Sequence, residues 1–238
     1  MDGVTTTAPR RTPDLIPGWV AAVRAGGGSA GEPRVREEGE RLVRRWDEPH
    51  RRYHDLAHLA DVLAALDLLA PPATSVALQT VPAKDDDPRV AAVLAAWFHD
   101  AVYLGQPGAD EEASAVLAEE VLPRLGVPIA VVTEVARLVR LTATHDPAPD
   151  DRAGALLVDA DLAVLAGGPE DYARYTAAIR QEYAHVPEPM FRARRAAVLE
   201  ALLDKPFLYR TAGGQARWEG AARANLRSEI AALRASGA

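Results

Sequence analysis

The stretch that decides the fold is VAAVLAAWFHDAVYL, at residues 90–104. It is apolar on every side as far as Phe98, which is the pattern of a helix buried in the centre of a protein. His99 and Asp100 follow directly, and more apolar residues come after them. A carboxylate in such surroundings costs free energy unless it is paired or bound to a cation. The segment therefore predicts either a capping Asp beside a core His or a metal site.

A second segment, RRYHDLAHLADVLAAL at residues 51–66, predicts another helix with polar residues at the edge of its apolar face. Its leucines and valine share one face at helical spacing. His58 lies at the edge of that face, and His54 lies one turn earlier. Two imidazoles at positions i and i+4 can converge on one ion. The alternative is a pair of half-buried surface histidines.

A third segment, ALLVDADLAVLA at residues 155–166, places Asp159 and Asp161 among apolar residues. Two residues along a helix correspond to a rotation of about 200°, so both carboxylates cannot face the same ion. One of them could bind a metal while the other caps a helix or pairs with an arginine. The alternative is a capping role for both.

Nearly all of the chain after residue 31 has helical periodicity, and no segment alternates like a strand. We therefore expect an all-α fold, with a long loop over residues 71–87. The predicted helices cover residues 33–47, 53–70, 88–104, 110–125, 128–143, 154–166, 170–184, 188–204 and 215–235. Prolines and a run of glycines predict an irregular N-terminal arm over residues 1–31. Residues 32–238 would then form a single helical domain.

The composition narrows the classes of function. The net charge is −7 and the pI is near 5.4, so the chain lacks the basic surface with which proteins bind nucleic acid polymers. A local basic pocket for a small phosphate ester remains compatible with this charge. There is no run of about eighteen apolar residues and no signal-peptide core. Cysteine is absent. We therefore expect a cytoplasmic protein without membrane contact, in which His and carboxylates hold any metal.

The three polar segments together supply imidazole nitrogens and carboxylate oxygens inside apolar helices. This donor set suits one divalent ion of manganese, cobalt, nickel, iron, magnesium or zinc in an open octahedral site. Four protein ligands leave room for a water and a substrate oxygen, as catalysis requires. The predicted metal ligands are His58, His99, Asp100 and Asp161.

The order of these residues resembles the HD superfamily of metal-dependent phosphohydrolases, whose pattern is H…HD…D on bundled helices. Further segments, spanning about residues 40–230, resemble in the same order a bacterial subgroup of predicted HD-superfamily phosphohydrolases. These segments are RRYHDLAHL, AAWFHDAVY, DEEASAVLAEE, LTATHD, LLVDADLAVLAG, YTAAIRQEY and ARANLRSEI. The resemblance implies an HD-domain-like helical bundle with additional C-terminal helices.

The resemblance also implies which residues act as ligands. His58 matches the first His of the pattern, because the spacing His-Leu-x-x-Val follows it. Asp161 rather than Asp159 matches the final ligand, because the family's Asp follows an alanine, as Asp161 does. Asp55 stands where the subgroup has Asn. This added carboxylate would either tune the metal or have no effect.

Catalytic roles are implied for three carboxylates. Asp100 would bridge to the attacking water or receive its proton, with Glu112 or Glu111 assisting. The alternative for the two glutamates is that they only favour the N-terminus of the helix that they open.

Four basic residues are predicted to contact substrate. Arg51 would clamp a phosphate in bidentate fashion, unless it is a solvated arginine in an Arg-rich run. His54 would be a fifth ligand, a substrate contact or a group that orients a ligand. His145 resembles the extra His that some HD proteins use for a second metal, and its alternative is a surface loop. Arg180 lies in a motif of the subgroup.

The activity implied by the resemblance is hydrolysis of phosphate esters or phosphoanhydrides of small molecules such as nucleotides, through a metal-activated water. One alternative is a di-iron oxygenase of the HD type, which would need about six ligands. Another is a non-catalytic domain that binds a nucleotide. The expected partners are a small phosphorylated substrate and, if the chain forms a homo-oligomer, further copies of itself. The six ligands of the di-iron alternative would be His54, His58, His99, Asp100, His145 and Asp161.

Overall fold

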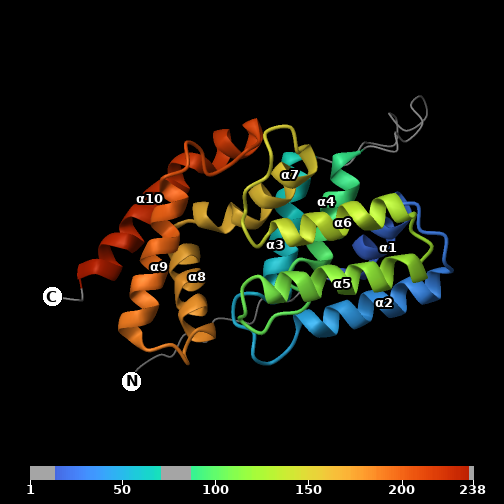
Figure 1. Ribbon diagram of the computed structural model, residues 1–238, viewed down its shortest axis with the longest axis horizontal. Helices are drawn as coiled ribbons and strands as arrows, with labels where there is room; N and C mark the ends of the chain where they lie inside the picture. Colours follow the sequence, from blue (N-terminus) through green and yellow to red (C-terminus); the bar gives the residue numbers. More distant parts are fainter. Residues whose placement is uncertain (1–13, 71–86, 236–238) are drawn as a thin grey trace, which may run out of the picture.

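The computed structural model describes residues 14–70 and 87–235. Within these ranges the chain forms ten α-helices, one 3₁₀ helix and no strand, which confirms the predicted all-α fold (Figure 1). No helix in the described part of the chain has the length and apolar character needed to cross a membrane. The predicted loop over residues 71–87 lies outside the described residues, apart from its last position.

The observed bounds agree with most of the predicted ones to within a few residues. The elements are α1 (Ile16–Ala25), α2 (Glu32–Trp46), α3 (Leu56–Leu69), α4 (Pro88–Phe98), α5 (Ala109–Arg124), α6 (Ile129–Leu141), α7 (Arg152–Asp161), the 3₁₀ helix η1 (Leu162–Ala166), α8 (Pro169–Glu182), α9 (Glu188–Leu203) and α10 (Ala212–Ala235). Three differences are described below: α3 begins later than predicted, α4 ends earlier than predicted, and α1 was not predicted.

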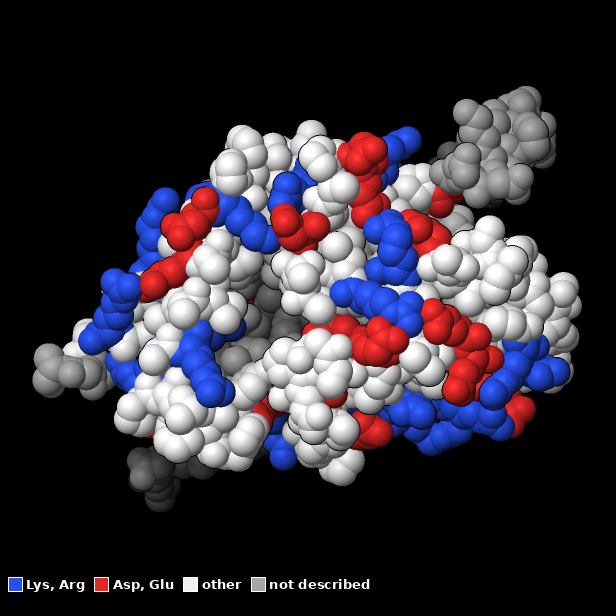
Figure 2. Space-filling view, viewed as in Figure 1, with Lys and Arg blue, Asp and Glu red and all other residues white. Residues whose placement is uncertain are grey.

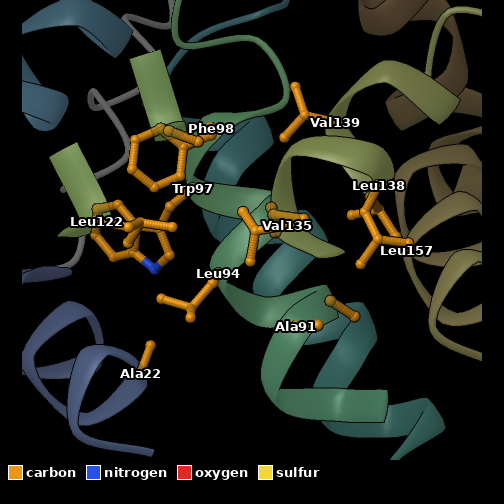
Figure 3. Packing of buried hydrophobic residues seen from close by; sticks show 14 of the residues in the cluster. Ala22, Ala91, Leu94, Trp97, Phe98, Leu122, Val135, Leu138, Val139 and Leu157 are labelled. Carbon is orange, nitrogen blue, oxygen red and sulfur yellow. The ribbon is translucent and has the colours of Figure 1, made fainter. Parts of the chain in front are cut away.

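Helix α4 runs through the centre of the larger hydrophobic core, as its composition predicts. It packs against α1, α3, α5, α6 and α7. Its Leu94, Trp97 and Phe98 are completely buried among the side chains of these helices (Figure 3). The helix begins at Pro88, where a backbone N–H is not needed, and the carboxylate of Asp87 accepts a hydrogen bond from the first turn.

Helix α4 ends at Phe98, before the predicted end at residue 104. The backbone N–H of His99 still donates to the Ala95 carbonyl at 2.9 Å, and the chain then turns. His99 and Asp100 therefore lie at the helix end rather than inside the helix. This position frees both side chains to meet groups from other helices.

Helix α3 begins at Leu56, later than predicted, because Asp55 acts as its N-cap. The Asp55 carboxylate accepts hydrogen bonds from the N–H groups of Ala57 at 2.8 Å and His58 at 3.2 Å. His54 is therefore outside the helix, and the predicted i, i+4 pair of helical histidines is wrong. The added carboxylate of Asp55 is a helix cap.

The prediction of an irregular arm over residues 1–31 is wrong for α1. This helix buries Trp19 and Val23 completely and packs against α2 and α4. Proline and glycine mark helix boundaries here. Pro17 occupies the first turn, where its missing N–H costs nothing, and three glycines starting at Gly26 end the helix.

A second, smaller core joins η1 with α8, α9 and α10. The side chain of Trp218 packs against both cores. The start of α10 is also fixed to α7, because the buried carboxylate of Asp159 accepts hydrogen bonds from the backbone N–H groups of Arg210 and Thr211. The C-terminal helices are thereby attached beside the end of α7.

Replacing Trp19 with alanine tests whether α1 is part of the core. We expect Trp19→Ala to lower the free energy of unfolding by about 3–5 kcal/mol, because it leaves a cavity between α1 and α4. Urea denaturation measures the change. The matched control is Leu68→Ala, on an α3 side chain that is 55% exposed, with an expected change within about 0.5 kcal/mol. Equal effects of the two substitutions would contradict the packing of α1.

Candidate metal centre

Three helix ends bring two imidazoles and two carboxylates together. His58 lies in the first turn of α3, His99 follows the end of α4, and Asp161 is the last residue of α7. Asp100 comes directly after His99. Both imidazoles are buried, and the two carboxylates are only slightly exposed, at 15% for Asp100 and 13% for Asp161.

The ligand atoms of these side chains face one another. The Nε2 atoms of His58 and His99 lie 3.1 Å apart. Asp161 Oδ1 lies 3.2 Å from Nε2 of His58 and 3.7 Å from Nε2 of His99. Asp100 Oδ2 has the reverse preference, at 3.2 Å from His99 and 3.7 Å from His58. His58, His99 and Asp161 form a group that could hold a metal ion, since their ligand atoms all lie within 4.8 Å of one another.

The spacing and chemistry of the donors fit a divalent ion. Metal bonds of about 2.0–2.2 Å to nitrogen and oxygen place neighbouring ligand atoms about 3.0–3.5 Å apart. The distances of 3.1 Å between the imidazoles and 3.2 Å between His58 and Asp161 fall in this range. A set of imidazole nitrogens and carboxylate oxygens, without sulfur, suits borderline and hard divalent ions.

The surroundings orient the imidazole of His99. Its Nδ1 lies 2.8 Å from the carbonyl oxygen of Ala96, so Nδ1 carries the hydrogen and donates it. Nε2 is thereby left as the atom that faces the cluster, the arrangement usual for a metal-binding His. The ring of Trp46 packs 5.2 Å from that of His99 and 6.2 Å from that of His58. It covers the pair on one side.

The electrostatics of the cluster favour a cation. Burial lowers the pKa of His99, but the carboxylates of Asp100 and Asp161 outweigh burial and raise this pKa to about 9. Burial raises the pKa of Asp161, but hydrogen bonds from His145 and His58 outweigh it and hold the pKa well below its ordinary value. The carboxylates of Asp100 and Asp161 stay ionised although they are mostly buried. Their negative charge is stabilised by a nearby positive charge, which a protonated imidazole or a metal ion can supply.

The structure brings Asp161, and not Asp159, into the group that could hold a metal ion. Asp161 belongs to the cluster, whereas Asp159 is completely buried on the other side of α7. The Asp159 carboxylate accepts hydrogen bonds from Arg210 N–H at 2.6 Å, from Thr211 N–H at 2.7 Å and from the Thr211 hydroxyl at 2.7 Å. Its role is to hold the start of α10.

His145 is beside the cluster, as predicted. Its Nε2 lies 2.7 Å from Asp161 Oδ2, the carboxylate oxygen that does not face His58. Its backbone has a φ of 48°, a left-handed conformation that is uncommon outside glycine. Lys205 Nζ donates to the His145 carbonyl at 2.8 Å and supports this turn.

Glu182, at the end of α8, is a site residue that sequence reasoning missed. Its Oε1 accepts hydrogen bonds from the three backbone N–H groups of residues 52–54, at 2.8, 2.8 and 3.0 Å. Its Oε2 lies 2.7 Å from Nδ1 of His54 and accepts from the Tyr103 hydroxyl at 2.9 Å. The YTAAIRQEY segment contains Glu182, but the resemblance draws attention to its neighbour Arg180.

His54 and Glu182 shift each other's pKa. Burial raises the pKa of Glu182, but its bonds with His54 and the backbone outweigh burial and lower the pKa to about 2. Burial lowers the pKa of His54, while Asp100 and Glu182 outweigh it and raise the pKa. His54 is therefore oriented by Glu182, and its raised pKa favours the protonated imidazole beside the candidate metal centre.

The prediction that Arg51 clamps a phosphate is wrong, and so is the alternative of a solvated side chain. Its guanidinium is completely buried. It donates to the carbonyls of His54 at 2.8 Å, Asp100 at 2.7 Å and Ala101 at 3.2 Å. Arg51 thus connects the turn before α3 to the turn after α4 and holds the two parts of the site in place.

Arg180 does not reach the cluster either. Its guanidinium donates to Glu188 at 2.8 Å, to the Tyr183 carbonyl at 2.6 Å and to the Val186 carbonyl at 3.2 Å. These contacts hold the connection between α8 and α9. The prediction of a substrate contact at Arg180 is therefore wrong.

The two predicted catalytic glutamates have structural partners. Glu112 is 55% exposed and pairs with Arg140 at 2.7 Å, so it is not placed to assist a water at the cluster. The Glu111 carboxylate accepts a hydrogen bond from Gly108 N–H at 2.5 Å and caps the start of α5. Its side chain nevertheless lines the cavity beside the site.

The cluster opens into a cavity of about 690 Å³. At the metal end the lining includes His54, Asp100, His145 and Asp161. The remaining walls come from the chain before and at the start of α5, the turn after α6, η1, α8 and α9. The space-filling view is hollowed between the α8–α9 side and the ends of α5 and α6 (Figure 2).

Comparisons with known proteins give no family for the chain. No family model, no curated protein and no solved structure matches it. The resemblance to the HD superfamily therefore stays a prediction based on sequence motifs. The geometry of the cluster and its cavity is the basis for the function proposed below.

Alanine substitutions at the two aspartates of α7 test the assignment of the ligand. We expect Asp161→Ala to lose bound metal, because it removes a ligand, and to lower the melting temperature of the metal-free protein less than Asp159→Ala does. Asp159→Ala leaves three donors without an acceptor, so it should destabilise by about 3 kcal/mol and keep the metal. Elemental analysis and the melting temperature measure both effects. The reverse pattern would show that the ligand is misassigned.

A pH series tests the role of Glu182 in the metal-free protein. Its pKa is about 2 in the fold against an ordinary value of 4.5, so the ionised carboxylate stabilises the fold above pH 4.5. This contribution is lost as the pH falls from 4.5 toward 2. We expect the difference in melting temperature between wild type and Glu182→Gln to be largest near pH 5 and to shrink with acidification. A difference that does not change with pH would contradict the assignment.

Proposed function

We propose that the protein is a metal-dependent phosphohydrolase of the HD type, acting on small phosphorylated molecules. The observation that carries the proposal is the buried group of His58, His99 and Asp161, which opens into a large cavity. Asp100, adjacent to both imidazoles, would complete the ligand set. A divalent ion in such a site supplies binding of a phosphate oxygen and a water of lowered pKa.

The side chains around the cluster have distinct tasks in this reaction. Asp100 is ionised, because His99 and His54 outweigh burial and lower its pKa, so it can accept a hydrogen bond from the attacking water and orient it. His54 lines the same cavity and is fixed through Nδ1 by Glu182. The raised pKa of His54 favours its cationic form, which would attract an anionic substrate.

Lys205 and His54 take the place of the arginines that the sequence suggested for binding phosphate. Lys205 lines the cavity and reaches the turn of His145. Arg51 and Arg180 are both occupied by backbone carbonyls. The phosphate would thus lie near the ammonium of Lys205 and the imidazoles of His54 and His145. The bound ion would offset the repulsion between the phosphate and the carboxylates of Asp100 and Asp161.

The single-ion reaction is better supported than the di-iron alternative. A six-ligand site would need both His54 and His145, and neither belongs to the group of His58, His99 and Asp161 whose ligand atoms lie within 4.8 Å of one another. His145 contacts the outer oxygen of Asp161, so a second ion beside it would have fewer protein ligands than the first. The non-catalytic alternative is disfavoured because every predicted core ligand lies at the cluster.

Metal reconstitution tests the proposal. Protein purified without metal would receive manganese, cobalt, nickel, iron, magnesium or zinc, and release of inorganic phosphate from monoesters and nucleotides would be measured. We expect turnover with at least one ion, and a loss of about 100-fold or more in His99→Ala and Asp100→Asn. The control Glu112→Gln, in an exposed ion pair, should keep its activity.

Two results would point to the alternatives. Nucleotide binding without turnover under any of these ions would favour a non-catalytic domain. Two irons per chain together with oxygen consumption would favour an oxygenase.

A further inference from the structure

The cavity beside the metal cluster has two chemically different ends. The metal end carries imidazoles and carboxylates, as described above. The opposite walls, from η1, α8 and α9, are mostly aliphatic and aromatic. Representative lining residues there are Leu165, Ile179, Phe191, Val198 and Leu202. A ligand that reaches from the cluster into this space must place its body against apolar side chains.

Two of the three polar side chains on the apolar walls already have partners. Helices α8 and α9 contribute three polar side chains to the lining: Tyr175, Arg194 and Arg195. The Arg195 guanidinium donates to Glu229 at 2.8 Å and to the Tyr175 hydroxyl at 3.0 Å. Both are thereby engaged with each other and with α10. Arg194 is exposed to solvent.

These walls suit one kind of ligand better than another. A nucleobase and a ribose carry several donors and acceptors, and burying them against groups that cannot pair costs free energy. An alkyl or aryl body carries none, and it gains affinity with each apolar group taken out of water. The cavity of about 690 Å³ is also large enough for such a body next to the phosphate.

We infer that the cavity accepts a phosphate monoester of an apolar alcohol, with the phosphate at the metal end and an alkyl or aryl body against α8 and α9. The inference rests on the proposed function for the reaction at the phosphate. The placement of the apolar body rests on the lining of the cavity alone. Nucleotides are therefore poor ligands of this site.

A series of n-alkylphosphonates from methyl to octyl, which cannot be hydrolysed, tests the inference by calorimetry. The full chain is titrated both without metal and with manganese added, and AMP serves as the nucleotide comparison. We expect the affinity to rise about two- to fourfold for each added methylene and octylphosphonate to bind more tightly than AMP. An affinity independent of chain length, or tighter binding of AMP, would overturn the inference.

Two exposed apolar residues of α9 provide a matched pair of variants. Val198 is 55% exposed and lines the cavity, whereas Met190 is 47% exposed and is not part of the lining. We expect Val198→Asn to weaken octylphosphonate binding about threefold or more and to leave methylphosphonate binding unchanged. Met190→Gln should leave both unchanged. Melting temperatures check that both variants fold.

An unaltered dependence on chain length in Val198→Asn would overturn the placement of the body. Phosphate release from n-octyl phosphate separates the two proposals. Graded phosphonate binding without release supports the ligand class and counts against hydrolysis. Release that does not depend on chain length overturns the ligand class and supports hydrolysis.

Discussion

The constraint on which the structure depends is the burial of two carboxylates and two imidazoles in an apolar interior. The pKa of Asp100 stays below its ordinary value there because of His99 and His54, and that of Asp161 because of His145, His58 and His99. Such a cluster is unfavourable unless its members have fixed positions and a compensating charge. Helix ends provide those positions, since each ligand lies in a first or last turn or directly after one.

Much of the fold and part of the site could be predicted from the sequence. A helix that is apolar on every side, such as the one before His99, is stable only in the centre of the core, and α4 lies there. Asp159 and Asp161 could not share one ion because of helical rotation, and they do lie on opposite sides of α7. These predictions succeeded because they depend on periodicity and burial, which are local properties of the chain.

The predictions that failed concern partners that are distant in sequence. Arg51 looks like a free cation in an Arg-rich run, but its acceptors are backbone carbonyls that only the fold brings to it. Glu182 lies 128 residues from His54 in the sequence, and no local sequence pattern predicts their contact. In α1, prolines and glycines were read as irregular chain although they mark the two ends of a short buried helix.

The spacing of the two aspartates in α7 also limits how this protein can change over evolutionary time. One carboxylate serves the cluster and the other anchors α10, with a single residue between them. Inserting or deleting one residue between them would rotate one side chain by about 100° relative to the other, so that both could not keep their partners. Length variation among descendants should therefore be absent from the end of α7, whatever lengths the surface connections acquire.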